Sequence, residues 1–416
     1  MAFVALQMVG LAVIPVITPT LQAQFAFDDA HIGLLTSAFA LAVSVTAIPM
    51  GLAAGRWGGR TLLVAAALFV AGSLMFAAAS SYPWFVAARF LQGLGAGAGL
   101  PVGIALLSNL VAPSRRHRAF GIFGLATGIG TVVPLLVMPS IVATGGYRAV
   151  FLVVAAAGVA VGAAAGALRV IRARPARVDP QAATPPFARV LGRAAREPRV
   201  LLIALMSLTS VAVVVGVLTW TPQFLHDQHG SSLAVAAYMT AGIGLAQIVG
   251  NPFGAFAMSR WGRNLVLVLF MALMTVTTAV IPLTPGLVVT SLAVMTSAFL
   301  VAALLPPTLG SIAVVVRGPA AVGAASGLVG LLNVGGSMLA PWLFGRLLDT
   351  YGTAPGQPGY VAGYLMLAGF ALAGTIGAVA FVVLRRSAGH GAAQSRTPAA
   401  EASPGPAGAL RDAGVE

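Results

Sequence analysis

The stretch RVIRARPARVDPQAATPPFARVLGRAAREPR, residues 169 to 199, divides the chain into two apolar parts of similar length. It holds eight arginines against two acidic residues, Asp179 and Glu197, and its five prolines interrupt any continuous helix. Long apolar runs with almost no charge lie on both sides of it. This pattern predicts a cytoplasmic loop in a two-part membrane protein, and a disordered linker between soluble domains is the weaker alternative.

The composition excludes an ordinary soluble fold. Of the 416 residues, 59% are hydrophobic and 8% are charged, and the mean hydropathy is +0.97, whereas soluble domains carry about 25% charged residues. The apolar runs are continuous and about 20 residues long, which favours spanning helices over the alternating strands of a barrel. Because the chain has no cysteine, disulfides and thiolate metal sites are excluded.

Runs of this length predict about twelve spans, six on each side of the basic loop. The first six are 2–21, 32–54, 61–79, 83–110, 119–143 and 149–167, and the second six are 201–221, 233–258, 265–283, 286–316, 320–344 and 361–384. The predicted fold is an all-α membrane protein with two pseudo-symmetric six-helix halves. We predict a first half at 1–168, a central loop at 169–199, a second half at 200–386 and a disordered cytoplasmic tail at 387–416.

The arginines predict the orientation. The chain has no lysine, and 20 of its 23 arginines fall on one side of the predicted spans, against two on the other side and one, Arg89, within a span. The positive-inside rule then places both termini in the cytoplasm. The net charge of +14 is therefore an orientation signal and not a nucleic-acid surface.

The two halves share sequence features in the same order. RWGGR at 56–60 recurs as RWGRN at 260–264, and Thr18 with Pro19 recurs as Thr221 with Pro222. These nearly equal shifts indicate a parallel repeat, in which two halves pack around a central pathway.

The stretch GLAAGRWGGR, residues 51–60, ends the second predicted span. Gly51 and Gly55 lie four apart and allow a close helix contact, while the glycines at 58 and 59 predict a tight turn. Its arginines face the cytoplasm, and on physical grounds a purely topological role for them is an equal alternative.

This stretch resembles the loop motif G-x-x-x-D-[RK]-x-G-[RK]-[RK] of the major facilitator superfamily, except that Gly55 replaces the Asp. In the family this Asp helps to latch the cytoplasmic gate, so a latch in this chain must use other groups. The resemblance implies a gating loop made of Gly51, Gly55, Arg56, Gly58 and Arg60, with Arg260 and Arg263 in the second copy.

A second stretch, RFLQGLGAGAGLPVG at 89–103, resembles the fourth-span motif of the same superfamily. Small residues at this spacing allow helices to approach closely, and a proline invites a kink. We predict a helix-packing role for Gly93, Gly95, Gly97, Gly99 and Pro101.

Arg89 is the one charged residue within a predicted span, and a central Arg costs about 3 kcal/mol on insertion scales. We therefore predict a substrate-binding role for Arg89, for Gln92 on the same helix face and for Asn333 in the eleventh span. The alternatives are snorkelling of Arg89 to the outer surface and interhelical packing by Asn333. All nine acidic residues fall in loops, at span ends or in the tail, so we expect no buried acidic relay.

The resemblance implies a secondary transporter of the bacterial inner membrane that works by alternating access. A lone Arg without a buried acid favours a small organic anion or zwitterion as substrate. The alternatives are efflux of hydrophobic or cationic compounds, and a membrane sensor or assembly factor without transport. We expect a monomer in the lipid bilayer, with no enzymatic activity, cofactor, metal or nucleic-acid partner. Direction and the coupling proton or ion stay open.

Overall fold

The computed structural model describes residues 2–57, 60–99, 116–167, 192, 195–316 and 319–394. Within these ranges it contains eleven α-helices and one short 3-10 helix. The first half holds α1 (Ala2–Phe25), α2 (Asp29–Trp57), α3 (Arg60–Ala78), α4 (Tyr82–Ala96) and α6 (Arg116–Ala167). The second half holds α8 (Pro198–His229), α9 (Leu233–Trp261), α10 (Arg263–Val280), η3 (Ile281–Leu283), α11 (Leu287–Val315), α12 (Pro319–Tyr351) and α13 (Gly359–Gln394).

The helix α6 covers two predicted spans. Its backbone leaves the helical region at Gly146, with φ 66° and ψ −169°, a conformation that is essentially restricted to glycine. The twelve predicted spans therefore correspond to eleven helices, and the fourth span is described as far as Gly99. Ten helical segments of the described chain are long and apolar enough to cross a membrane. The all-α, two-half fold is confirmed.

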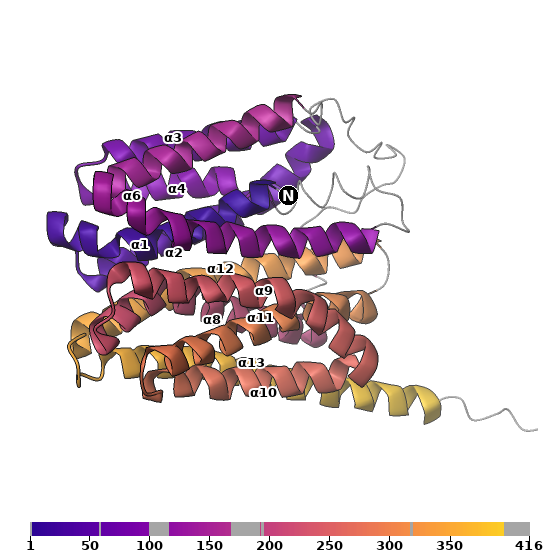
Figure 1. The fold of residues 1–416 in the computed structure, drawn as a ribbon. Helices are drawn as coiled ribbons and strands as arrows, with labels where there is room; N and C mark the ends of the chain where they lie inside the picture. Colours follow the sequence, from indigo (N-terminus) through magenta and orange to yellow (C-terminus); the bar gives the residue numbers. More distant parts are fainter. Residues whose placement is uncertain are drawn as a thin grey trace, which may run out of the picture.

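The two halves lie side by side with their helices running in the same general direction (Figure 1). They meet along two pairs of helices, α2 against α12 and α6 against α9, and α1 also contacts α8. The end of the bundle that holds Asp28, Asp29, Asp227 and Asp349 is called the outer end below, following the predicted orientation. This orientation stays a prediction.

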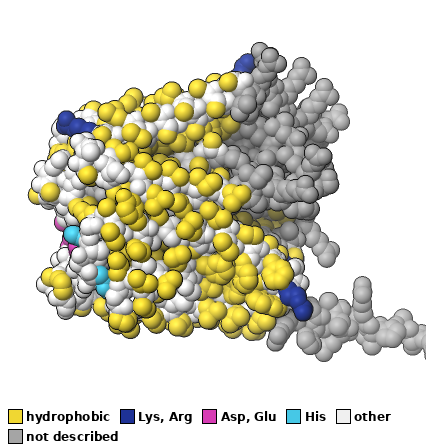
Figure 2. Space-filling view, viewed as in Figure 1, with side chains coloured by type: hydrophobic (Ala, Val, Ile, Leu, Met, Phe, Trp, Pro, Cys, Tyr) yellow, Lys and Arg dark blue, Asp and Glu magenta, His cyan; other side chains and the backbone are white. Residues whose placement is uncertain are grey.

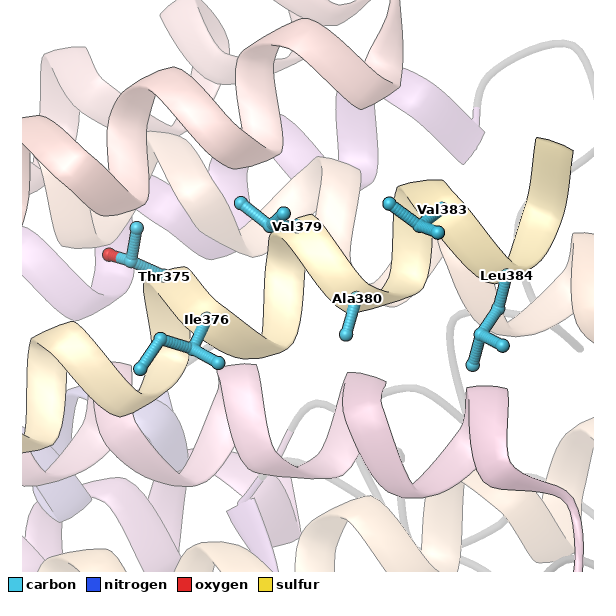
Figure 3. Close-up of a pocket in the computed structure, with 6 residues that line it drawn as sticks. All are labelled: Thr375, Ile376, Val379, Ala380, Val383 and Leu384. Carbon is cyan, nitrogen blue, oxygen red and sulfur yellow. The ribbon is translucent and has the colours of Figure 1, made fainter.

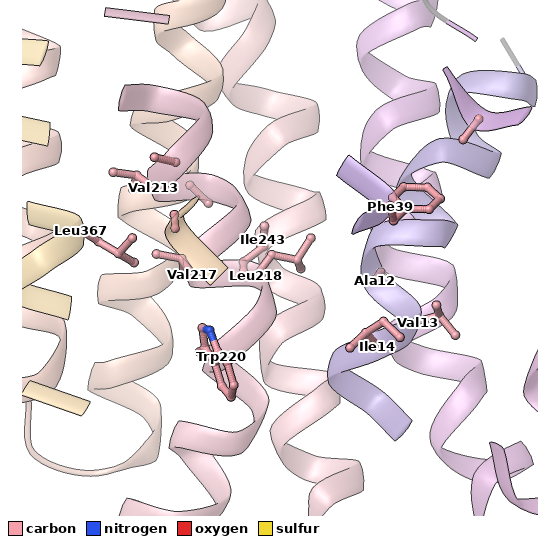
Figure 4. Packing of buried hydrophobic residues seen from close by; sticks show 14 of the residues in the cluster. Ala12, Val13, Ile14, Phe39, Val213, Val217, Leu218, Trp220, Ile243 and Leu367 are labelled. Carbon is pink, nitrogen blue, oxygen red and sulfur yellow. The ribbon is translucent and has the colours of Figure 1, made fainter. Parts of the chain in front are cut away.

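Apolar side chains fill each half. Ala12, Val13, Ile14 and Phe39 pack in the first half, and Val213, Val217, Trp220 and Leu367 pack in the second (Figure 4). Within a bilayer such contacts stabilise the bundle mainly through van der Waals packing, because lipid tails are as apolar as the side chains.

The outside of the bundle is also apolar. Hydrophobic side chains cover the middle of the face in Figure 2, and acidic and histidine side chains appear at its left end. A shallow groove on α13 is lined by Thr375, Ile376, Val379, Ala380, Val383 and Leu384 (Figure 3). Ile376 is 62% exposed. Large exposed apolar patches of this kind mark a membrane-contacting surface, so we assign this groove to lipid contact.

Some predicted segment limits differ from the structure. The helix α13 continues to Gln394, so the first eight residues of the predicted tail, 387–394, are helical. The helix α8 begins at Pro198, inside the predicted central loop, because proline suits the first turn of a helix. Residues 168–191 of the loop region and residues 395–416 of the tail lie outside the described residues. The limits of the two halves stay predictions.

Candidate functional site

Arg89 lies on α4 and is fully buried. Its guanidinium donates from Nε to the Leu35 carbonyl oxygen at 3.3 Å, from Nη2 to the Gly10 carbonyl oxygen at 2.8 Å, and from Nη1 to Oε1 of Gln92. It also lies 4.3 Å from the ring centroid of Phe39, a favourable cation–π contact. The cation is thus held by backbone carbonyls, an amide and a ring instead of a carboxylate.

Gln92 extends this network to a third neighbouring helix. Its Nε2 donates to Oγ of Ser73 at 2.8 Å, and Ser73 Oγ in turn donates to the Phe69 carbonyl oxygen at 2.7 Å. Arg89 and Gln92 therefore tie α4 to α1, α2 and α3, and every partner belongs to the first half. Their predicted role in substrate binding stays a prediction.

The glycines of the fourth-span motif lie where neighbouring backbones approach closely. A Cβ on Gly93 would lie 2.4 Å from the Phe39 carbonyl oxygen, and one on Gly97 would lie 2.4 Å from that of Val43, both on α2. A Cβ on Gly95 would lie 2.4 Å from the Ala65 carbonyl oxygen on α3. Gly99 lies beside Phe3 on α1. Pro101 lies outside the described residues.

The gating-loop residues divide between two helix ends. Gly51, Gly55 and Arg56 belong to the last turns of α2, Arg60 opens α3 and is exposed, and Gly58 lies outside the described residues.

In the second copy, Gly262 joins α9 to α10 with φ 86°. Arg260 is exposed, and Arg263 donates from Nη1 to the Gly310 carbonyl oxygen on α11 at 3.1 Å. Both copies place arginines at helix ends. Their gating role stays a prediction.

The halves touch midway along α6 and α9. A Cβ on Gly128 of α6 would lie 2.7 Å from the Gly244 carbonyl oxygen of α9, so the two backbones approach closely. Oγ1 of Thr131 lies 3.5 Å from Oε1 of Gln247 across the same contact. The sequence gives no signal for this contact, because helix periodicity does not show which face meets the other half.

Two amide oxygens on helices that meet the other half lack partners among the described residues. Asn251 donates from Nδ2 to the Gln247 carbonyl oxygen at 3.1 Å, but its Oδ1 is buried without a hydrogen-bond partner in the described structure. Oδ1 of Asn333 on α12 is also buried without a hydrogen-bond partner in the described structure. Asn333 precedes Met338 by five residues, roughly 7.5 Å along the helix, and the Met338 carbonyl oxygen accepts from Ser37 of α2. Both orphan acceptors therefore lie on helices that meet the other half, α9 and α12.

The outer end holds a contact that the sequence did not predict. Asp349 of α12 accepts from the backbone N–H groups of Asp29 and Ala30, the first two residues of α2, each at 2.9 Å. Oδ1 of Asp29 accepts from Gln22 at 2.7 Å and from Gln223 of the second half at 3.1 Å.

Asp29 is 7% exposed, so the expectation that no acid is buried is wrong for this residue. The cause is α12, which covers the start of α2. Within the described ranges, no three His, Asp or Glu side chains lie close enough together to bind a metal ion.

Comparison with known proteins agrees with this architecture. The family model "Major Facilitator Superfamily" matches residues 1–341. The inner membrane transport protein YajR of Escherichia coli (strain K12) is 33% identical over 153 residues, which cover 36% of this chain and 33% of that protein. The multidrug resistance protein MdtL of Salmonella paratyphi B is 27% identical over 262 residues, which cover 61% of this chain and 64% of that protein. The matches thus span less than two thirds of these relatives.

A solved structure shows the same fold over nearly the whole chain. A bacterial homologue of the human lysosomal transporter Spinster, in an inward-facing and occupied conformation, superposes with a TM-score of 0.72. The alignment covers 92% of this chain and 95% of that chain, at 18% sequence identity. At this identity the likeness shows the fold alone.

Proposed function

Because the chain belongs to the major facilitator superfamily, we propose that it is a secondary transporter that exports hydrophobic or cationic small molecules by alternating access. It acts without enzymatic chemistry, in the inner membrane with both termini in the cytoplasm, and a proton or ion gradient supplies the energy. The carrying observation is that unpartnered amide acceptors lie on helices that meet the other half, whereas Arg89, the one fully buried cation among the described residues, bonds only within the first half.

The hydrogen bonds that occupy Arg89 support a hydrophobic or cationic substrate. An anion site needs a guanidinium that faces the pathway, but all three described hydrogen bonds of Arg89 go to groups of the first half. Binding an anion there would require breaking buried charge-assisted hydrogen bonds, which contribute about 1.5–3 kcal/mol each. The structure therefore offers a role for Arg89 in holding the first half together.

The two unpartnered amide oxygens also support a hydrophobic or cationic substrate. Oδ1 of Asn251 and Oδ1 of Asn333 are buried without donors in the described structure, and such groups usually find a partner, which here a substrate could supply. A compound with an apolar body and a hydroxyl, amide or ammonium donor would satisfy either of them. The relative MdtL is named a multidrug resistance protein, which fits this class.

An efflux assay tests the proposal. Cells that lack their own exporters would express the chain and be loaded with ethidium, a lipophilic cation, or with fluorescein, an anion. We expect faster ethidium efflux, which Asn251→Leu and Asn333→Leu slow about five-fold, since each removes about 1 kcal/mol of hydrogen bonding. The control Ser259→Ala changes an exposed residue. Unchanged ethidium efflux in both Asn variants would contradict the proposal.

A small organic anion is the second candidate, because Arg89 is a buried cation with no carboxylate within ion-pair distance among the described residues. In the same assay it predicts fluorescein efflux that Arg89→Gln abolishes. A sensor or assembly factor predicts no flux of either dye.

A further inference from the structure

At the outer end, one helix start of the first half docks on a carboxylate of the second half. The N–H groups of Asp29 and Ala30 donate to Oδ1 and Oδ2 of Asp349, and a negative charge is favourable at a helix N-terminus. Gln223 of α8 adds a bond from the second half to Asp29, and Gln22 of α1 adds one from the first half. We call Gln22, Asp29, Gln223 and Asp349 the outer latch.

The contact continues inward along α2 and α12. A Cβ on Gly33 would lie 2.4 Å from the Pro341 carbonyl oxygen, and one on Gly345 would lie 2.3 Å from that of Asp29. Ser37 then donates to the Met338 carbonyl oxygen. The outer ends are therefore closed here, and opening them requires that the outer latch separate.

Negatively charged side chains lie close together at the outer latch. Asp227 of α8 and Asp349 of α12 both lie near enough to Asp29 to repel it. Tyr360 of α13 donates to Oδ2 of Asp227 at 2.5 Å, and on α2 itself Asp28 is paired with His31. Among the neighbouring charged groups, His226 on α8 lies next to Asp227, and Arg346 on α12 lies three residues before Asp349. In the described part of the chain, neither Asp29 nor Asp349 has an ion pair.

The buried amide oxygen of Gln223 lacks a hydrogen-bond donor. Gln223 is 8% exposed, and while its Nε2 donates to Asp29, its Oε1 has no hydrogen-bond partner in the described structure. A carboxylate can only accept hydrogen bonds, but a protonated carboxyl can also donate one. A proton on Asp29 would supply a donor to this amide and remove one negative charge from the cluster.

We propose that the outer latch is a proton-binding site, in which Asp29 holds one proton while the outer ends are closed and releases it when they open. Asp29 is the binding group because it is the buried carboxyl, whereas both oxygens of Asp349 already accept backbone N–H groups. A proton that binds the closed form more tightly shifts the equilibrium toward that form. Acid therefore closes the outer ends and alkali opens them, whatever the substrate is.

Distance measurements test this directly, because the natural chain has no cysteine. Spin labels on Ser80→Cys, between α3 and α4, and on Ala354→Cys, between α12 and α13, would mark exposed outer positions in the two halves. The full chain would be reconstituted in liposomes and measured at pH 5 and pH 8. We expect a short distance at pH 5 and a several-fold larger long-distance population at pH 8.

Three variants make the test specific. Asp29→Asn should give the same distances at both pH values, since it cannot titrate. Asp28→Asn, which changes an exposed neighbour within the first half, should respond like the parent protein. Gln223→Leu should increase the long-distance population at pH 5, because it removes a bond between the halves. A pH-independent parent, or a response that persists in Asp29→Asn, would overturn the proposal.

These outcomes are independent of the proposed function. The measurement needs no substrate, so a pH-dependent latch in a protein that exports neither dye would refute export and leave the latch standing. Export by a protein whose outer distance ignores pH would refute the latch alone.

Discussion

At the scale of single residues, Arg89 shows what the sequence could and could not predict. Its isolation in an apolar run marked it as unusual. Its partners could not be predicted, because Gly10 and Leu35 lie 79 and 54 residues away and contribute backbone carbonyls. Any residue type carries a carbonyl, so the side-chain sequence holds no signal for this contact.

The network around Arg89 predicts a stability effect. Arg89→Leu leaves the Gly10 and Leu35 carbonyl oxygens and Gln92 without their donor, at about 1–3 kcal/mol for each buried group. We expect a clear fall in the melting temperature of the purified protein, followed by intrinsic fluorescence. Arg60→Leu, at an exposed helix start, is the matched control. Equal melting temperatures for both variants would argue against a packing role for Arg89.

Asp29 is the residue on which sequence reasoning failed. Its position next to a span end was predicted correctly, but its burial was not, because Asp349 reaches it from 320 residues further along the chain. The consecutive acids at 28 and 29 before an apolar run are typical of a helix start, where carboxylates are common and mostly solvated. Only the packing of α12 distinguishes the buried acid from the exposed one.

At the scale of helices, hydropathy predicted the positions of individual spans. The predicted second span, 32–54, lies within α2, and the predicted gap between 143 and 149 contains the break at Gly146. The repeat between the halves stays a prediction, and its matched threonines make the same local bond. Thr18 donates to the Ile14 carbonyl oxygen at 2.9 Å, and Thr221 donates to that of Val217 at 2.6 Å. Both matched threonines thus bond four residues back along their helices.

The break in α6 predicts opposite effects for two glycine substitutions. Gly146 has a positive φ and no neighbour within 4 Å of an added Cβ, so Gly146→Ala adds backbone strain of about 1–3 kcal/mol without a clash. Gly369 is helical and equally open, so Gly369→Ala should be neutral or stabilising by about 0.5–1 kcal/mol. Thermal unfolding of both variants checks the signs. A stabilised Gly146→Ala would contradict the described break.

At the scale of the whole molecule, composition and arginine placement predicted an all-helical membrane protein with two halves. They could not predict how the halves meet, because contacts such as Gly128 with Gly244 and Asp349 with Asp29 depend on helix rotation and tilt. The contacts at the outer end close one side of the molecule. A protein with two such halves can expose a site alternately by rocking them against each other.

If the substrate is an apolar or cationic compound bound without Arg89, ligand-induced thermal stabilisation will show it. The purified protein and Arg89→Gln would be measured over a panel of anionic, neutral and cationic compounds. A ligand at 100 times its Kd adds about 2.7 kcal/mol of stability, which is measurable. We predict that lipophilic neutral or cationic compounds stabilise both proteins by the same increment. Stabilisation by anions alone, lost in Arg89→Gln, would contradict binding without Arg89.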